Sequence, residues 1–485
     1  MGVQIAPLVG ALFAIPYLLG VLGTDKLGVL ALSWGIVGYF SLFDFGLGRA
    51  LTQRVAVHLA SNELAKLPST VWGVLILLFI LGLIGLIVAY SVSSWIVFSV
   101  LKVPQILAEQ TLFSFKLIAF SIPIIVISSG LRGLLEGLGR FSLLNWIRLP
   151  IGLLTYLLPL FVAQFNKELP VIVGSLIVLR FVGLVIQWLM CLKVMPSLLV
   201  LTEIKSIQFK PLLSFGGWMT VSNIVAPLMV YLDRFIIGSL VSLSAIAIYV
   251  IPYEVVTKLW IIAAAITSVL LPGFSSAYLQ SREQVGSIFS MGMKVTFIFL
   301  TPAIIPLLFI SPELLQLWLG NAALHESVSV VRWISIGVLI NSFAQICFTL
   351  IQGVGRPDVT AKLHLLEFPV YILLLYYLII FWGVEGAAIA WTVRVGIDAL
   401  LLSVISGRYL NFIPLRSFRL VIPLFFLVGI CIASLTIEDS TLRWTLMVFS
   451  EIGSIAIGWF FVMGTNDRRE CLNWVQQKMH RFNII

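Results

Sequence analysis

The sequence has few charged residues for its length. Of its 485 residues, 11% are Asp, Glu, Lys or Arg and 60% are hydrophobic, and the mean hydropathy is +1.10. A soluble protein carries about 25% charged residues, so a chain of this composition lacks the polar groups that a water-exposed surface requires. We therefore predict an integral membrane protein.

Motifs for metal, redox and nucleotide chemistry are missing as well. The four histidines form no His-Glu-x-x-His pattern, and the sequence contains no Gly-x-x-x-x-Gly-Lys-[Ser/Thr] phosphate loop, which argues against a zinc enzyme or an ATPase. The widely spaced cysteines predict small apolar packing residues rather than a disulfide framework. We expect no metal, no cofactor and no catalytic residue. The cysteines are Cys191, Cys347, Cys431 and Cys471.

Apolar runs long enough to cross a membrane occur throughout the chain. A spanning helix needs about 20 apolar residues, and runs of this length exclude the two-residue alternation of a membrane β-strand. The sequence therefore predicts an all-α polytopic membrane protein with about fourteen helices. Their approximate ranges are 3–23, 28–47, 71–92, 112–131, 149–165, 170–192, 213–238, 244–271, 288–310, 328–351, 363–383, 386–407, 420–437 and 443–464.

The connections between these spans divide by charge. With a cytoplasmic N-terminus, nineteen Lys and Arg residues fall on the cytoplasmic side and four on the other side. Basic residues prefer the cytoplasmic ends of short loops, so both termini are predicted to be cytoplasmic. The same bias accounts for the formal net charge of +9, and we expect no nucleic-acid partner. The first run lacks the basic start and cleavage site of a signal peptide, so we expect it to be a retained span.

A short motif occurs twice at an offset of 216 residues. "GLGR" at residues 137–140 corresponds to "GVGR" at residues 353–356, and Arg180 corresponds to Arg394 at an offset of 214. Six predicted spans separate the two copies, which indicates parallel repeats because an even number preserves orientation. The glycines would form turns, and the arginines would hold both turns at the inner head groups, where they could also meet an incoming diphosphate.

The repeat predicts how the chain is organised. Two six-helix bundles are followed by two additional helices and a cytoplasmic tail. The predicted ranges of these parts are 1–195, 212–408, 417–464 and 465–485.

Charged residues inside the predicted spans are the candidates for substrate contact. Each costs about 2.5–3.5 kcal/mol at a helix centre and should face a partner or a water-filled cavity. Glu254 and Lys258 are four residues apart, so one helix face would carry both. Arg394 and Asp398 have the same spacing. Local partners are therefore predicted for these two cations.

Three other cations, Lys116, Arg180 and Lys294, have no acid within one helical turn. Each needs an anion from another helix or from a ligand, and both alternatives stay open. Lysine and arginine suit phosphate oxygens, so a cavity that contains such cations is compatible with a phosphate-bearing substrate. The candidate substrate-binding cations are Arg180, Lys294, Arg234, Lys116, Lys258 and Arg394.

Two stretches carry a family resemblance. "AIPYLLGVLGTDKLGVLALSWGIVGYFSLFDFGLGRALTQRVA" (residues 14–56) strongly resembles the first two spans of O-antigen and polysaccharide-unit flippases. "YLDRFIIGSLVSLSAIAIYVIPYEV" (residues 231–255) resembles the start of their second half. These flippases belong to the multidrug/oligosaccharidyl-lipid/polysaccharide (MOP) exporter superfamily, and the resemblance extends over essentially the whole chain.

The resemblance implies a V-shaped, two-bundle transporter like the MATE exporters, which works by alternating access in a bacterial inner membrane. Its substrate would be an undecaprenyl-diphosphate-linked oligosaccharide, such as an O-antigen or related polysaccharide repeat unit, moved from the cytoplasmic to the outer leaflet. A coupling ion (H⁺ or Na⁺) and other polysaccharide-assembly proteins of the lipid bilayer are further expected partners. By motif position, the resemblance adds Asp44, Arg49 and Asp233 to the candidate site and supports Arg234. Asp44 could equally pair with a neighbouring arginine.

Two other functions fit the same predicted spans. A cation-coupled multidrug exporter of the same superfamily would need acids that face the cavity, whereas a diphosphate site needs cations. A membrane-embedded polysaccharide polymerase or ligase would need outer loops or domains in which to assemble its site, and the predicted connections are short throughout.

Overall fold

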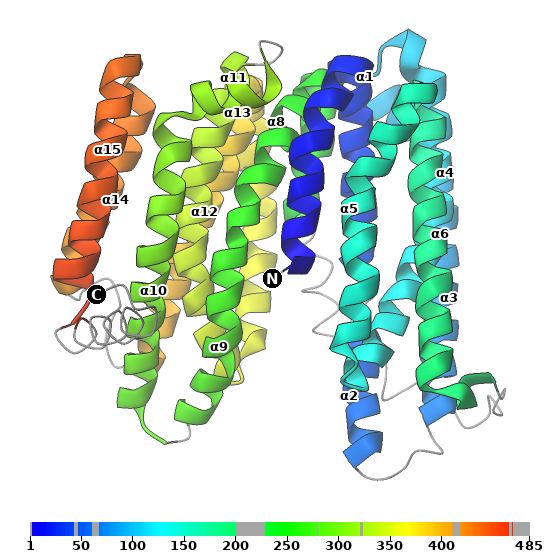
Figure 1. Ribbon diagram of the computed structural model, residues 1–485, viewed down its shortest axis with the longest axis horizontal. Helices are drawn as coiled ribbons and strands as arrows, with labels where there is room; N and C mark the ends of the chain where they lie inside the picture. Colours follow the sequence, from blue (N-terminus) through cyan, green and yellow to red (C-terminus); the bar gives the residue numbers. More distant parts are fainter. Residues whose placement is uncertain are drawn as a thin grey trace, which may run out of the picture. The chain divides into compact units, whose positions relative to one another are not determined.

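In the computed structural model, the described part of the chain is almost entirely helical and contains no strand (Figure 1). Ten of the described helices are long and apolar enough to cross a membrane. The predicted all-α membrane class is therefore confirmed, whereas the count of fourteen spans stays a prediction. The described residues are 2–42, 47–60, 67–199, 228–278, 280–320, 324–410, 418–464 and 468.

The chain divides into two compact units, which are described separately. The bundle ranges expected from the sequence repeat, 1–195 and 212–408, stay a prediction. The first unit consists of Met1–Val255, Trp318–Ala323 and Ala361–Ala390, and the second of Val256–Leu317, Leu324–Thr360 and Trp391–Ile485.

The first unit takes most of its helices from the N-terminal half of the chain. They are α1 (Gly2–Leu42), α2 (Leu47–Ala60), α3 (Leu67–Trp95) with the π-helical turn Ile96–Val100, α4 (Gln105–Gly137), α5 (Phe141–Phe165), α6 (Leu169–Val194) with the 3₁₀ turn Pro196–Leu199, the helix of residues 228–240, and α8 (Leu243–Val256).

The second unit takes most of its helices from the C-terminal half. They are the 3₁₀ turn Thr257–Leu259, α9 (Trp260–Tyr278), α10 (Arg282–Phe309), α11 (Ser311–Leu319), α12 (Leu324–Gly353), α14 (Phe418–Thr436), and α15 (Ser440–Ile457) with the π-helical turn Gly458–Val462; the two units share α13 (Pro357–Leu410).

Helix α1 reverses direction at Gly23, which has a φ of 77° that side-chain-bearing residues rarely adopt. Both halves of α1 reach Tyr156 of α5. A Cβ added to Gly10 would lie 3.6 Å from the Tyr156 Cβ, and the Trp34 ring centroid is 5.0 Å from that of Tyr156. A straight helix would separate residues 10 and 34 by about 36 Å. The reversal matches the predicted boundary between spans 3–23 and 28–47.

Helix α13 reverses in the same way at Gly383, where φ is 55°. A Cβ added to Gly386 would overlap the carbonyl oxygen of Leu378. These two residues would be about 12 Å apart along a straight helix, so the backbone must turn sharply between them. The turn matches the predicted boundary between spans 363–383 and 386–407.

Polar contacts within the first unit join helix ends that are predicted to lie on the same side of the membrane. The Nζ of Lys26 donates to the carbonyl of Lys167 at 2.9 Å, and both residues are predicted on the outer side. The indole N–H of Trp72 donates to the carbonyl of Leu198 at 3.1 Å, and both are predicted on the inner side. The packing therefore agrees with the predicted alternation of spans, and which side is cytoplasmic stays a prediction.

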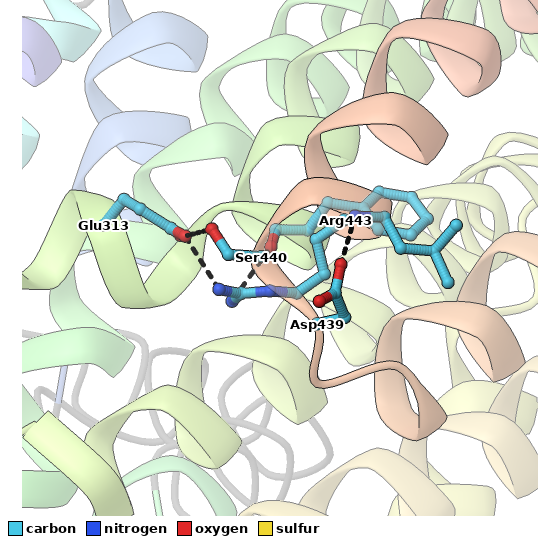
Figure 2. Close-up of polar contacts among 6 residues, drawn as sticks. Glu313, Asp439, Ser440 and Arg443 are labelled. Atoms are coloured by element: carbon cyan, nitrogen blue, oxygen red, sulfur yellow. Dashed lines mark hydrogen bonds and ion pairs between the residues drawn. The ribbon is translucent and has the colours of Figure 1, made fainter.

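In the second unit, an ion pair attaches the C-terminal helices to the rest of the unit. Figure 2 shows Arg443 of α15 reaching Glu313 of α11, with Nη2 2.7 Å from Oε1. The hydroxyl of Ser440 lies 3.3 Å from the same carboxylate oxygen, and Asp439 caps α15 by accepting from the backbone N–H of Leu442 at 2.7 Å. Arg443, counted above as an outer-side cation, thus has a protein partner.

The repeated Gly-x-Gly-Arg motif forms the same turn twice. We call residues 137–148 the first elbow and residues 353–364 the second elbow. Gly139 and Gly355 have φ values of 68° and 85°. In each elbow the arginine N–H donates to the carbonyl five residues back, at 2.8 Å and 3.1 Å. The two elbows therefore share one backbone conformation.

The first glycine of each elbow packs against a helix that lies earlier in the chain and belongs to the same unit. A Cβ on Gly137 would lie 2.7 Å from the Cβ of Val55 in α2, and one on Gly353 would lie 2.8 Å from the Cβ of Phe274 in α9. A backbone carbonyl of the same helix lies nearby in both places, at 2.9 Å and 3.3 Å. Glycine is thus required by close helix packing as well as by the turn.

We expect Gly137→Ala and Gly353→Ala to destabilise the protein by about 1–3 kcal/mol each, because overpacking forces the helices apart. The measurement is the midpoint of thermal unfolding in detergent. Gly174→Ala in α6 is the matched control, since its Cβ would meet no atom within 4 Å. Equal midpoints for all three variants would contradict the close packing.

Candidate functional site

A buried ion pair lies within the first unit. Arg234, in the helix of residues 228–240, donates from Nη2 to Oε1 of Glu254 in α8 at 2.9 Å. Arg234 is only 1% exposed. A lone cation at such a position would carry a desolvation cost of several kcal/mol, which the nearby carboxylate offsets. Glu254 therefore has a partner twenty residues away that its spacing from Lys258 did not indicate.

Asp233 is held by two protein donors. Its Oδ1 accepts from the backbone N–H of Arg234 at 2.7 Å, and its Oδ2 accepts from the hydroxyl of Tyr249 at 2.7 Å. Both Asp233 and Tyr249 are 0% exposed. The carboxylate thus links the helix of residues 228–240 to α8.

The guanidinium of Arg234 lies among aromatic rings and against a glycine. Its Cζ is 4.8 Å from the ring centroid of Tyr231 and 5.7 Å from that of Tyr253, which is within cation–π range. A Cβ on Gly35 of α1 would lie 3.0 Å from Nη1. Nε and Nη1 are buried with no acceptor among the described residues, and the same holds for the indole N–H of Trp34.

Arg180 of α6 lines a small cavity with residues of α1 and α4, among them Ser33 and Ser121. The side chain is half-buried, and its guanidinium makes no hydrogen bond or ion pair with any described residue. Arg132 and Tyr156 are close enough to interact with it electrostatically. Tyr156 interacts in the same way with Arg234. Tyr156 is thus approached by Arg180 of α6 and by Arg234 of the helix of residues 228–240.

Lys116 of α4 has an aromatic neighbour in place of the expected anion. Its Nζ lies 5.2 Å above the ring of Tyr90 in α3. A cation–π contact of this kind stabilises an ammonium group without a counter-charge. Lys116 is thus accommodated by the protein itself.

The other candidates lie in the second unit or outside the described residues. Lys258 falls in the 3₁₀ turn after α8, and Lys294 is half-buried in α10. Arg394 is half-buried one turn before Asp398 in α13, as their spacing predicts. Asp44 lies outside the described residues. Arg49 belongs to α2, and its side chain is not among those described.

An apolar groove of about 430 Å³ lies between α3, α4 and α6 of the first unit. Trp72 and Trp188 flank it, with ring centroids 5.6 Å apart. No charged residue lines it. The groove therefore offers no charged group to a phosphate.

Several residues around Arg234 and Arg180 were missed by sequence reasoning. Tyr231 lies three residues before Arg234, and Tyr253 lies directly before Glu254. This proximity to charged residues was the available signal. Tyr156 gave no signal, because an isolated tyrosine in an apolar helix is ordinary. Arg132 was assigned to a connection, although α4 extends beyond it to Gly137.

Sequence comparisons place the chain beside proteins of polysaccharide export. A family model described as "Polysaccharide biosynthesis protein" matches residues 21–328. A protein of Shigella flexneri named as an O-antigen transporter is 31% identical over 407 residues, which cover 80% of this chain and 94% of that protein. AglR of Haloferax volcanii, named as a flippase, is 24% identical over 187 residues, or 38% of this chain and 39% of that protein.

Two solved structures share the fold. The lipid II flippase MurJ in an inward closed conformation has a TM-score of 0.71 at 13% identity, over 94% of this chain and 97% of that chain. A multidrug resistance MATE family transporter of the MOP superfamily, in an inward-facing conformation, has a TM-score of 0.68 at 16% identity, over 86% of this chain and 97% of that chain. At such low identity the likeness concerns the fold alone.

We expect Glu254→Gln to destabilise the protein by about 3–5 kcal/mol, because Arg234 would stay buried and charged without its acid. The double variant Arg234→Met/Glu254→Gln should lose less stability than the two single variants together, because no uncompensated charge remains. Thermal unfolding of the purified variants measures both effects. Strictly additive losses would show that the pair contributes nothing as a pair.

Proposed function

Because the chain belongs to the polysaccharide biosynthesis protein family of transporters, we propose that it is a flippase for a lipid-linked oligosaccharide. The single observation that carries the proposal is the match to the Shigella flexneri protein named as an O-antigen transporter, 31% identical over 94% of its length. The fold shared with the lipid II flippase MurJ agrees with this function. The family resemblance predicted from the sequence is thereby confirmed.

The substrate that we propose is an oligosaccharide on undecaprenyl diphosphate, an O-antigen or related repeat unit. Its diphosphate requires several hydrogen-bond donors with positive charge inside a low-dielectric bundle. Arg180 supports this requirement, because its guanidinium has no hydrogen bond or ion pair among the described residues and Arg132 lies near it. Arg234 adds two buried donors without a described acceptor.

We propose that transport proceeds from the cytoplasmic to the outer leaflet of a bacterial inner membrane by alternating access, with both termini in the cytoplasm. In this scheme Arg180 contacts the diphosphate, and Arg234 supplies its Nε and Nη1 donors while Glu254 holds Nη2. Lys294, Lys258 and Arg394 stay candidate substrate-binding residues of the second unit. The coupling ion, H⁺ or Na⁺, has no residue assigned to it.

A multidrug exporter is the rival function, since the fold is shared with MATE transporters. Such an exporter would use acids to bind cationic drugs. In the described part of the first unit, Asp233 accepts from Tyr249 and Glu254 pairs with Arg234. These two acids are engaged by the protein and Arg180 lacks a described hydrogen-bond or ion-pair partner, which supports an anionic substrate at Arg180.

We expect Arg180→Gln to reduce transport at least about tenfold, since a hydrogen bond to a charged group contributes about 1.5–3 kcal/mol. Transport is measured as surface polysaccharide restored to a strain that lacks the gene. Lipid-linked units should accumulate on the cytoplasmic leaflet of the same cells. Arg180→Lys should retain part of the activity because it keeps the charge.

Lys193→Gln is the matched control, because it removes a cation from the exposed end of the same helix α6. It should leave transport near the wild-type level. Full polysaccharide display by Arg180→Gln would exclude Arg180 from the mechanism. Full display by a deletion strain that encodes no second flippase would overturn the proposed function itself.

A further inference from the structure

The two elbows share a backbone conformation and a burial pattern, but they differ in their exposed side chains. At the offset of 216 residues, Leu144 corresponds to Thr360, each 3% exposed, and Ile147 corresponds to Leu363, each 8% exposed. Both elbows lie between two helices of membrane-spanning length, so both sit at a membrane boundary. Differences between their exposed residues therefore concern what each elbow meets there.

In the second elbow, the arginine is neutralised by its own chain. Arg356 Nε lies 2.9 Å from Asp358 Oδ1, and Nη2 lies 3.2 Å from Oδ2. This two-point contact between guanidinium and carboxylate also raises the pKa of Arg356. A guanidinium whose Nε–Nη2 edge is occupied by a carboxylate has fewer donors left for another anion.

In the first elbow, the corresponding arginine keeps its donors. Ser142 stands where the second elbow has Asp358, and Arg140 is exposed. Glu136 is the acid within one helical turn of Arg140, yet no ion pair joins the two side chains in the described structure. Arg148 is a second exposed cation two turns along α5.

Aromatic side chains make a second difference. Phe141 is 59% exposed and Trp146 is 77% exposed at the start of α5. Pro357 and Lys362 occupy these places in the second elbow. Large aromatic residues at a membrane boundary rest at the level of the lipid head groups. The first elbow thus combines a cation that has no described ion-pair partner with two exposed aromatic side chains.

We propose that the first elbow, and not the second, binds the phosphate head group of an anionic phospholipid in the leaflet that it faces. Arg140 donates to the phosphate, while Phe141 and Trp146 pack beside the glycerol and upper acyl carbons. We assign the ligand to the surrounding bilayer, because Phe141 and Trp146 are exposed and aromatic side chains favour the level of the head groups.

Net charge alone does not distinguish the elbows. Residues 136–148 and residues 352–364 each contain two basic residues and one acidic residue, with His364 counted as neutral. The second elbow is therefore a matched control within the same molecule. The proposal depends on whether the arginine of an elbow is paired with an acid. A single substitution can add that acid to the first elbow or remove it from the second.

The experiment exposes the purified full-length protein in detergent to phosphatidylglycerol, phosphatidylcholine and undecaprenyl diphosphate together. Native mass spectrometry counts the copies of each lipid that stay bound. Arg140→Gln should lower phosphatidylglycerol binding about fivefold, the effect of one cation at a lipid surface. Arg356→Gln should leave it unchanged, and neither variant should alter phosphatidylcholine binding.

Two further variants add an acid to the first elbow or remove it from the second. Ser142→Asp should place a carboxylate beside Arg140 and reproduce the loss, whereas Asp358→Ser should release Arg356 and increase phosphatidylglycerol binding. These two variants keep both arginines, so they test the proposal even if Arg140→Gln is poorly folded. Unfolding midpoints verify that each variant is intact.

Three results would overturn the proposal. Equal losses from Arg140→Gln and Arg356→Gln would mean that general charge attracts the lipid. Unchanged binding in Ser142→Asp would mean that pairing is irrelevant. If Arg140→Gln lowered the binding of undecaprenyl diphosphate and left that of phosphatidylglycerol unchanged, the first elbow would be assigned to the substrate. Because the lipid assay involves no transport, its outcome is independent of the proposed function.

Discussion

The hydrocarbon core of the membrane offers no hydrogen-bond partner to the peptide backbone, and the fold follows from that constraint. Every described span is helical, and many serine hydroxyls bond to a carbonyl of their own helix, as Ser114 does to the carbonyl of Gln110 at 2.7 Å. Reversals occur where glycine permits a positive φ, at Gly23 and Gly383. These two positions let long helical segments fold back within a few residues.

The same medium determines which charges belong to the protein and which are available to a substrate. Arg234 is fully enclosed, and it has a carboxylate and two aromatic rings around it. Lys116 has the ring of Tyr90. The described groups that interact electrostatically with Arg180 are a tyrosine and another arginine, and no described acid is among them. An uncompensated cation is expensive in a low dielectric, so its retention favours a role in binding an anion.

Sequence reasoning recovered the features that depend on residues close together in the chain. Hydropathy located the reversals at Gly23 and Gly383 because a loss of apolar character coincides with a glycine there. It missed the partner of Glu254 because Arg234 is twenty residues away on another helix. Lys258 lies in the 3₁₀ turn that follows α8, and its predicted pairing with Glu254 stays a prediction.

The repeated motif shows why some positions stay alike and others differ. A Cβ added to Gly137 or to Gly353 would lie less than 3.0 Å from a side-chain atom of a neighbouring helix, so both copies need glycine. Ser142 and Asp358 lie on the outer side of the same turn, where no packing constraint selects the residue. The backbone of the elbow is thus determined by helix contact, whereas its charge is free to change. Similarity between the two elbows therefore reflects shared backbone geometry and close helix packing, which leave the residues at exposed positions free to differ.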